Sequence, residues 1–514
     1  MCESERTPIK LLIVCVGCRL ARRKPRLDKL LEPVKMSGSL RYYMLLLLIV
    51  AVFYVISKFI FDEVNDTIQI VIDEYFHIPQ GISYCNGNFS YWDPKITTLP
   101  GLYLVSSVIG VFFECNTYNL RFVNLIASCV NLVLFSSILK YVYYNDKNHM
   151  KIILQAVNLA ILPPLYFFSH VYYTDVLSLT FLLMFSRLCL TYRYLIPILI
   201  CGVCSIFMRQ TNVVWIAMVF GHKLLDLLIR SSRVFGNQFI NDVKLSKRSL
   251  IARDVDKSKL KRYYGMWDVY CAAKYHLTSQ LTTFFRFITF HDATILFTHM
   301  LILNGFITFV YINGSIVVGD KTAHQATIHT PQLLYFLVFY GVFGLPYVVS
   351  KLRTTLKLIV KEKILVLLCG IIFSLMVHHN TLVHPYLLAD NRHFTFYIWN
   401  RWYGKYDFAM YAMVPVYIFL LFSIYDNLKD QNCISFLLPC TVSLILALAL
   451  QKLIEIRYFL VPYIVLRLRF GRPSYPVVIS EFVWYVLINT AAFNVFFNKE
   501  VFWQNFEYAQ RIIW

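Results

Sequence analysis

The sequence predicts an all-α integral membrane protein, a polytopic bundle of about 11–14 transmembrane helices. Of the 514 residues, 58% are hydrophobic and only 15% are charged, whereas a soluble domain carries about 25% charged residues. The apolar residues also come in blocks, such as 42–61 and 436–450, that recur along the whole chain. A helix of about 20 apolar residues spans the hydrocarbon core of a bilayer, so these blocks predict membrane spans.

The expected spans follow one another closely. In chain order they are 42–61, 99–113, 123–143, 152–168, 176–192, 195–220, 293–312, 332–350, 364–378, 408–425, 433–450, 457–466 and 476–497. We therefore expect a single transmembrane domain over 41–514. We interpret residues 1–40 as a basic cytosolic tail; Met36 would make a natural start, so residues 1–35 are either part of that tail or an extension foreign to the native protein.

The net charge of +20 indicates sidedness rather than a nucleic-acid partner, because Lys and Arg gather in loops between the apolar blocks. Positively charged loops stay on the cytosolic side. With the N-terminus in the cytosol, the cytosolic segments are the tail, the long polar insertion 222–292 with its densely basic part 244–262, and the segments 351–363 and 467–472.

The opposite side then receives the loops 62–98, 313–331 and 379–407, which are poor in Lys and Arg. Three N-glycosylation sequons lie in the first two of them, at Asn65, Asn88 and Asn313. The 13 cysteines are scattered with no repeating spacing, so no disulfide framework is expected.

The first of these loops opens with Asp73, Glu74 and His77. An acidic pair beside a membrane end is costly unless it is used or neutralised. It suits a general base, oriented by a neighbouring side chain; the alternative is a helix cap with solvated charges. The same loop ends in "WDPKITTLPGLYL" (92–104), whose Lys95, Thr97 and Thr98 offer a cation and two hydroxyls, or else form a cap of the next helix.

The two other loops carry further polar groups. Residues 313–332 contain Asp320, Lys321, His324 and His329; the His spacing fits no helical zinc motif, so we expect a polar lid over a substrate and no metal. The third loop contains Asp390, Asn391, Arg392 and His393, followed by aromatics that include Tyr397. Arg suits a phosphate and aromatics suit sugar faces or a polyisoprenyl chain; the alternative is an interfacial aromatic belt with a snorkelling Arg.

Three smaller motifs are "YYTD" (172–175), "RQTN" (209–212) and "EIRYFLVPY" (455–463). Arg209 lies within an apolar block, so it must pair or line a cavity. Glu455 and Arg457 lie at a span end near the same side as the polar loops. Two classes fit these residues: a membrane transferase with a lipid-phosphate donor, or a transporter of a polar solute. A transporter usually places its charges near the bilayer midplane, so charges in loops favour the enzyme.

The motifs "DEYFHIPQ", "WDPKITTLPGLYL", "RQTNVVW", "NGSIVVGDKTAH", "LLADNRHFTFYIW" and "EIRYFLVPYIVLRL" resemble, in this order, the dolichyl-phosphate-glucose α-1,2-glucosyltransferase family of the endoplasmic reticulum. The resemblance runs from about residue 41 to Trp514, and position 175 is Asp where Glu is expected. It implies a multispan (GT-C) glycosyltransferase in the endoplasmic reticulum membrane with its active site facing the lumen. The implied reaction transfers the third glucose from dolichyl-phosphate glucose to the diglucosylated dolichyl-diphosphate oligosaccharide, with inversion; the choice of glucose over mannose rests on the resemblance alone.

Inversion needs one base and no cofactor. We predict Asp73 as that base, with Glu74 as the alternative, and a donor phosphate held by Arg392, then by His393 or Lys321. The residues expected to bind substrate are His77, Trp92, Asp93, Lys95, Thr97, Thr98, Asp320, His324, Asp390, Asn391, Tyr397, Glu455 and Arg457. Membrane lipid surrounds the protein, and the sequence indicates no oligomeric state.

Overall fold

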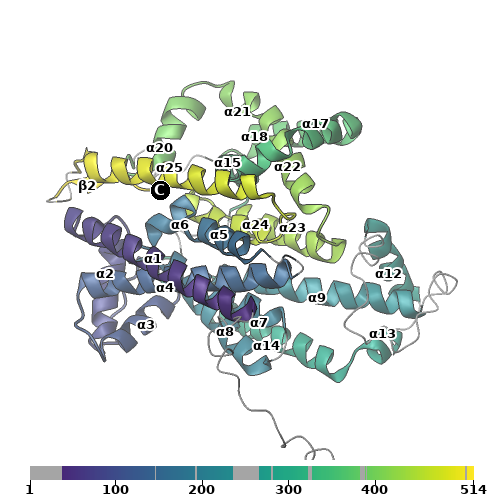
Figure 1. Cartoon of the computed structure of the whole chain (residues 1–514), viewed down its shortest axis with the longest axis horizontal. Helices are drawn as coiled ribbons and strands as arrows, with labels where there is room; N and C mark the ends of the chain where they lie inside the picture. The colour runs from purple at the N-terminus through teal and green to yellow at the C-terminus, as the bar shows by residue number, and fades with distance from the viewer. Residues whose placement is uncertain are drawn as a thin grey trace, which may run out of the picture. The chain divides into compact units, whose positions relative to one another are not determined.

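Helices make up most of the computed structural model (Figure 1). The structure describes residues 38–514 except 145, 147, 192–193, 236–264, 279–281, 322–326, 383–387, 389, 504–505 and 507. The chain divides into two compact units, residues 1–45 and 46–514. Of the first unit only the opening turns of α1 (Gly38–Thr67) are described, so the expected tail lies outside the described residues.

Seven helices among the described residues are long and apolar enough to cross a membrane. They are α1, α4 (Thr117–Val142), α9 (Asn212–Phe235), α14 (Phe290–Asn313), α18 (Lys363–Asn380), the consecutive pair α21 (Ala409–Ala412) and α22 (Val414–Leu428), and α25 (Tyr475–Asn498). Three shorter apolar helices are α8 (Leu195–Met208), α15 (Pro331–Phe343) and α23 (Ile434–Leu448). The predicted class, a polytopic all-α membrane protein, is confirmed.

Several expected spans are interrupted, which is why the long helices are fewer than predicted. The expected span 152–168 is divided into α5 (His149–Ala160) and α6 (Pro163–Phe168), and 332–350 into α15 and α16 (Leu345–Ser350). Prolines stand at the start of α6 and in the first turn of α16. Proline cannot continue a preceding helix without a lost hydrogen bond, so each proline begins a new helix.

The expected span 195–220 is wrong as a single helix. Helix α8 ends at Met208, Arg209 is extended with φ −151° and ψ 123°, and α9 begins at Asn212. Arg209 leaves the helix to form an ion pair with Asp175, and the Asn212 amide donates to the Ser205 carbonyl at 2.8 Å. The expected polar insertion 222–292 is also partly helical, because α9 continues to Phe235 and α12 (Met266–Thr278) and α13 (Thr282–Phe287) follow.

The expected loop 62–98 is wrong in two respects. Its first residues belong to α1, and its middle forms α2 (Glu74–Cys85), which packs on α3 (Gly101–Ile109). A disulfide also joins Cys85 to Cys115, a single pairing that the scattered cysteine spacing did not indicate. A Cβ at Gly110 would lie 2.2 Å from the Cys85 carbonyl oxygen. Glycine at 110 therefore permits the close approach that brings these two cysteines together.

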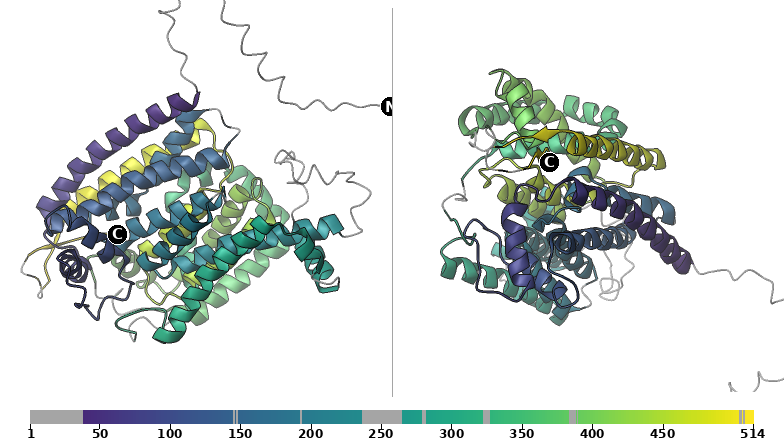
Figure 2. Two further views of the ribbon diagram at one scale, coloured as in Figure 1. Left: turned by 90° about the horizontal axis from the view of Figure 1, so that it is seen from below. Right: turned by 90° about the vertical axis from the view of Figure 1, so that its left-hand side faces the viewer.

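A buried ion pair anchors the C-terminal part of the chain. Arg467, at the end of α24 (Leu460–Arg467), donates to Glu481 of α25 at 2.8 and 2.7 Å, and both side chains are fully buried. Helix α25 packs along α5 and α6 (Figure 2). The short 3-10 helix η5 (Ile456–Phe459) precedes α24 directly. The ion pair between α24 and α25 therefore also restrains η5.

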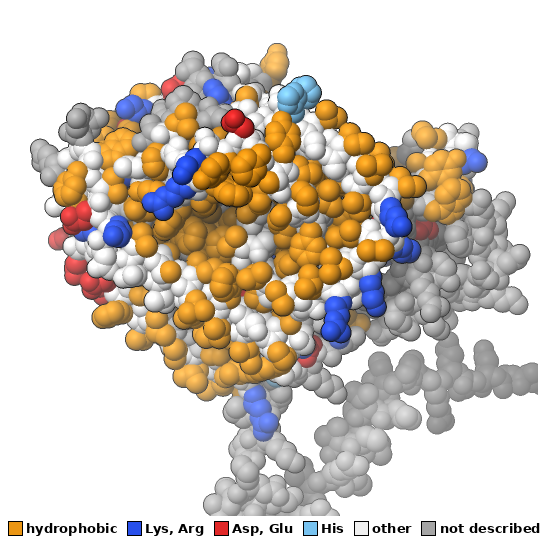
Figure 3. All heavy atoms as spheres, turned by 90° about the horizontal axis from the view of Figure 1, so that it is seen from above, with side chains coloured by type: hydrophobic (Ala, Val, Ile, Leu, Met, Phe, Trp, Pro, Cys, Tyr) orange, Lys and Arg blue, Asp and Glu red, His pale blue; other side chains and the backbone are white. Residues whose placement is uncertain are grey.

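Apolar side chains are exposed to an extent that water would not tolerate. On the face shown in Figure 3, hydrophobic side chains cover a large area, with Lys and Arg at scattered positions. Leu48, Phe112 and Leu367 are 61%, 75% and 66% exposed. Large contiguous apolar surface of this kind indicates contact with lipid.

The small β structure lies near the end of the chain. β1 (Glu500–Val501) pairs with β2 (Gln510–Arg511) in antiparallel register. Beyond it, Ile513 forms a bridge with His393, and the peptide N–H of Ile513 donates to the Arg392 carbonyl at 2.7 Å. The last residues therefore hold the segment 390–393, which carries one of the predicted polar groups.

Candidate functional site

Asp73 lies at a tight turn directly before α2. Ile72 has φ +34°, which is rare for a β-branched residue and costs about 1–3 kcal/mol. Such a conformation persists only where its surroundings impose it; here the Asp73 peptide N–H donates to the Tyr173 hydroxyl at 3.0 Å. The Asp73 carboxylate makes no cap bond to α2, so the capping interpretation does not account for it. Its side chain is 36% exposed.

The Glu74 side chain, unlike that of Asp73, is fully buried, and it pairs with the equally buried Arg121 of α4. The Arg121 guanidinium donates to its carboxylate at 2.9 and 2.6 Å. The peptide N–H groups of Val71 and Tyr172 donate to it as well, at 2.8 and 2.6 Å. A carboxylate with four donors and no exposed surface is held as a structural group, and this placement does not suit a base that must reach a substrate hydroxyl.

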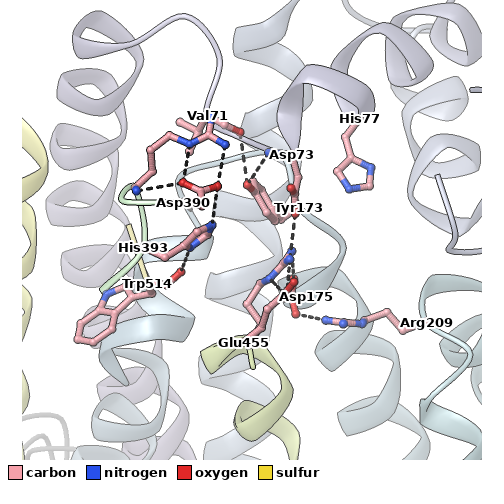
Figure 4. Close-up of polar contacts among 12 residues, drawn as sticks. Val71, Asp73, His77, Tyr173, Asp175, Arg209, Asp390, His393, Glu455 and Trp514 are labelled. Atoms are coloured by element: carbon pink, nitrogen blue, oxygen red, sulfur yellow. Dashed lines mark hydrogen bonds and ion pairs between the residues drawn. The ribbon is translucent and has the colours of Figure 1, made fainter. Parts of the chain in front are cut away.

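Arg457 links Asp73 to two further carboxylates, those of Glu455 and Asp175. Its Nη2 donates to Oδ2 of Asp73 at 2.9 Å and to Oε2 of Glu455 at 2.5 Å, and its Nη1 lies 3.8 Å from Oδ2 of Asp175. Asp175, in the first turn of α7 (Thr174–Cys189), forms a further ion pair with Arg209. Figure 4 shows this chain of charges beneath Asp73.

The array fixes the charge of Asp73. Burial by itself raises the pKa of its carboxyl, but Arg457, and after it His77 and His393, outweigh burial and lower that pKa below its ordinary value. Asp73 is therefore a carboxylate at neutral pH, as an acceptor of a proton must be.

The His77 ring lies on the same side of α2 as Asp73. Its Nδ1 and the Tyr103 hydroxyl are 2.6 Å apart, and Trp92 packs edge-on against Tyr103. Burial lowers the pKa of His77, and Arg457 adds to this, against Asp73 and Asp175, which raise it. His77 is therefore held by the fully buried Tyr103, against which Trp92 also packs.

The segment 92–98 is held beside α2 by Gln80. Its amide donates to the Tyr91 carbonyl at 2.8 Å and its carbonyl oxygen accepts from the Asp93 peptide N–H at 2.9 Å. The exposed Lys95 lies with Nζ 5.0 Å from the centre of the Phe76 ring. Thr97 and Thr98 are half-buried, and the Thr97 carbonyl accepts from the Gln210 amide at 2.9 Å. The polar residues at 73–77 and those at 92–98 therefore form one surface.

The loop after α14 packs on this segment. The Asp320 peptide N–H donates to the Pro94 carbonyl at 2.7 Å and that of Val318 to Thr97 at 3.2 Å. Between them Gly319 has φ +65°, and a Cβ there would lie 2.4 Å from two carbonyl oxygens. The exposed Lys321 donates to the Asn313 carbonyl at 2.5 Å, within its own loop. His324 lies outside the described residues.

The polar residues 390–393 of the third predicted loop form a compact unit. Arg392, only 7% exposed, grips Asp390 with Nε and Nη2 at 2.9 and 2.8 Å, and its guanidinium lies 4.1 Å from the centre of the Trp503 ring. His393 Nδ1 lies 3.1 Å from the main-chain oxygen of Trp514. The third nitrogen, Nη1 of Arg392, is buried and has no hydrogen-bond partner among the described residues, so it is available to an anion.

The structure brings Asp73, Arg457, Glu455, Asp390 and His393 into one region (Figure 4). Asn391 accepts instead from the Trp503 indole at 2.8 Å. Tyr397 lies in α20 (Phe394–Ile398) under the Arg401 guanidinium, and η4 (Trp399–Tyr403) follows it. Among the described residues, the contacts of Tyr397 and Lys321 do not connect them with Asp73.

Two charged residues of the array, Asp175 and Arg209, were not among the predicted site residues. The motifs "YYTD" and "RQTN" had drawn attention to them, and the demand that an Arg inside an apolar block be paired was the available signal. The partners themselves, 34 residues apart, follow only from the packing of α7 on α8.

The three sequons differ in setting. Asn88 is exposed in the turn after α2, where a glycan has room. Asn65 lies inside α1 against Arg121 at 3.4 Å, and the Asn313 amide donates within its own loop to Ser315 and Val317. Across the residues that the structure describes, no group of three or more His, Cys, Asp and Glu has the arrangement of a metal site.

Comparison with known proteins relates most of the chain to one family. The model of the DIE2/ALG10 family matches residues 67–468. A relative from Drosophila melanogaster is 39% identical over 90% of this chain and 97% of its own length. Relatives from Mus musculus and Homo sapiens are each 35% identical over 86% of this chain and 93% of theirs. All three are named Dol-P-Glc:Glc(2)Man(9)GlcNAc(2)-PP-Dol alpha-1,2-glucosyltransferase. No solved structure matches the chain.

Proposed function

The chain belongs to the DIE2/ALG10 family, and we propose that it is the dolichyl-phosphate-glucose-dependent α-1,2-glucosyltransferase of N-glycan precursor assembly. It transfers the third, terminal glucose to the diglucosylated oligosaccharide on dolichyl diphosphate. The names of relatives that align over nearly their whole length support this activity. The family membership confirms the resemblance that the motifs had indicated.

The position of Asp73 is the observation that carries the mechanism. Its carboxylate is ionised and partly exposed, whereas Glu74 is enclosed by four donors. Asp73 takes the proton from the acceptor 2-hydroxyl as that oxygen forms a bond to C1 of the donor glucose. The bond from C1 to the phosphate oxygen breaks, and its electron pair leaves with dolichyl phosphate. One displacement of this kind inverts the β-linked donor to an α-linked product.

Arg392 stabilises the leaving phosphate. Asp390 holds two of its nitrogens and Trp503 supports its plane, so the third nitrogen is presented in a fixed direction. Fixed donors aimed at developing negative charge are among the strongest catalytic contributions. His393, beside Asp390 at 3.8 Å, is the second candidate. Because dolichyl phosphate is already a good leaving group, we propose that the reaction needs neither an acid nor a metal.

The site faces the lumen of the endoplasmic reticulum in this proposal. The predicted loops 62–98, 313–331 and 379–407, which contribute Asp73, Asp390 and His393 to it, are poor in Lys and Arg compared with the segments assigned to the cytosol, which favours the opposite side. The Cys85–Cys115 disulfide at the end of α2 also favours an oxidising compartment. Asn88, three residues beyond Cys85 at this helix end and exposed, offers an acceptor for a glycan there.

The glycan profile of cells tests the proposed activity. Cells without this gene should accumulate the lipid-linked oligosaccharide with two glucoses, and the intact chain should restore the form with three. Accumulation of a form that lacks mannose would instead identify a transferase that uses dolichyl-phosphate mannose. A normal profile would exclude the transferase and favour transport of a polar solute.

A further inference from the structure

A polar pocket lies beside Arg457 and Asp175, and Asp73 is not part of its lining. Its wall is formed by α7, the interruption between α8 and α9, the end of α23, and η5 with α24. Its polar lining residues include Asp175, Ser178, Arg209, Asn212, Gln451 and Arg457. Trp215 and Tyr458 add aromatic surface. None of the roles proposed above requires a pocket at this place.

One oxygen of this pocket has no hydrogen bond. The Asp175 side chain is 3% exposed and its Oδ1 is paired with Arg209. Its Oδ2 accepts no hydrogen bond within the described part of the chain and lies 3.8 Å from Nη1 of Arg457. A buried carboxylate oxygen without a donor is costly, so a ligand that brings a donor there would gain affinity.

The charges select the ligand. Asp73, Glu455 and Asp175 carry three negative charges against two positive charges on Arg209 and Arg457. The charged side chains that line the pocket itself, Asp175, Arg209 and Arg457, sum to +1, but both guanidinium groups are already paired with these carboxylates, so the pocket does not favour a second phosphate. Carboxylate, guanidinium, amide and hydroxyl groups side by side offer both acceptors and donors. With an indole beside them, they suit a neutral polyol with an apolar face, which is a hexose ring.

We propose that this pocket is a hexose subsite in which Oδ2 of Asp175 accepts a hydrogen bond from a ring hydroxyl. The proposal rests on the proposed function and extends it to the recognition of a glucosyl ring. Arg457 is the shared wall, because the same guanidinium contacts Asp73 and faces Asp175. A ring in the pocket therefore contacts the same arginine as the base. The ring belongs either to the donor or to the terminal glucose of the acceptor, and the two sources have the same chemistry.

Kinetics with separately varied substrates test the pocket. Asp175→Asn should raise the KM of one substrate about 10- to 100-fold, the worth of a hydrogen bond to a charged group. Asp175→Glu, which keeps the carboxylate, should restore most of the affinity. Because loss of the Arg209 ion pair can impair folding, Gln451→Ala is the second variant. Gln451 is half-buried and stands outside the ion pairs, and its replacement should raise the same KM about 2- to 10-fold.

Asp292→Asn is the matched control, since this partly buried aspartate pairs with Lys223 at 2.7 Å and does not line the pocket. A rise confined to the donor KM assigns the pocket to the donor ring, and one confined to the acceptor KM assigns it to the acceptor. Unchanged KM values for both substrates in folded Gln451→Ala and Asp175→Asn, relative to wild type, would overturn the subsite.

A binding measurement without turnover separates this proposal from the proposed function. Methyl glucopyranoside should stabilise the wild-type protein against thermal unfolding in detergent, and Gln451→Ala should weaken that effect. If the wild-type protein shows no transferase activity but retains this response, only the proposed function fails. If transfer occurs and neither the KM values nor the thermal response change in the variants, only the subsite fails.

Discussion

Nη2 of Arg457 donates to Oδ2 of Asp73 at 2.9 Å, although 384 residues separate the two in sequence. The guanidinium keeps the proposed base ionised in a partly buried setting, where desolvation by itself would raise the pKa of the carboxyl. The same group contacts Glu455 and lies near Asp175. The protonation state of Asp73 therefore depends on Arg457 of η5, which lies near the C-terminal end of the chain.

Arg457→Gln should change the pH dependence of the reaction. In the wild-type enzyme Arg457, with His77 and His393, lowers the pKa of Asp73 below its ordinary value of 3.8. The carboxylate is then ionised at every pH above about 5, and kcat/KM has no acid limb from Asp73 in that range. Without Arg457, burial dominates, the pKa rises, and kcat/KM should fall as the pH drops from about 7 to about 5. Arg401→Gln, at an exposed arginine, is the control, and coincident profiles for wild type and Arg457→Gln would contradict the coupling.

Glu74→Gln should damage the fold rather than the chemistry. Removing one partner of a buried ion pair leaves the other charge uncompensated and costs about 3–5 kcal/mol; Glu74 and Arg121 are both fully buried. We expect a lower thermal unfolding temperature in detergent and a lower yield of monodisperse protein. Asp73→Asn, at a side chain that is 36% exposed, should be close to the wild type in both measurements. A stable Glu74→Gln protein without turnover would identify Glu74 as the base.

Arg392→Lys keeps the positive charge but loses the planar fork that holds Asp390 and presents Nη1. A lysine cannot replace two parallel N–H donors and a stacked guanidinium. The KM for dolichyl-phosphate glucose should rise and kcat should fall, while the KM for the acceptor should stay near its wild-type value. Arg401→Lys serves as the exposed control. Equal effects on both KM values would argue against a specific phosphate contact.

The turn after α2 should carry a glycan. Asn88 is exposed and its Oδ1 accepts from Ser90, the third residue of its sequon. Treatment with a glycosidase should reduce the mass of the wild-type protein expressed in eukaryotic cells, and Asn88→Gln should abolish the reduction. A cysteine introduced at Asn88 should resist a membrane-impermeant thiol reagent applied from the cytosol. Labelling by that reagent would contradict the lumenal placement.

The sequence predicted the class of fold because that class depends on local patterns, whereas the roles of the site residues stay predictions. Apolar blocks, loop charges and motif order are properties of neighbouring residues. The interruption at Arg209 was not predicted, because hydropathy alone does not distinguish a continuous span from two helices joined by an extended arginine. The Cys85–Cys115 disulfide was missed for a related reason: the pairing depends on how α2 and α3 pack at Gly110.

The sequence named Asp73 first as the base and left Glu74 as the alternative, and it did not show how differently the two carboxylates are placed. The two are adjacent in the chain and both suit a base chemically. The turn at Ile72 sends one carboxylate to Arg457 and the other to Arg121. Only the placement of α4 and η5 around α2 separates the partly exposed group from the enclosed one. Lys321 is a residue whose charge suggested a phosphate contact. Its ammonium group instead donates to the Asn313 carbonyl within its own loop.

Turnover by Asp73→Asn tests the central claim most directly. Asparagine keeps the shape of the side chain but cannot accept the acceptor proton as a carboxylate does. With purified protein, synthetic dolichyl-phosphate glucose and a diglucosylated acceptor, kcat should fall about 10²- to 10⁴-fold, the usual worth of a positioned base. Yield, monodispersity and both KM values should remain near those of the wild type. Near-normal turnover by the folded Asp73→Asn protein would contradict the assignment of Asp73 as the base.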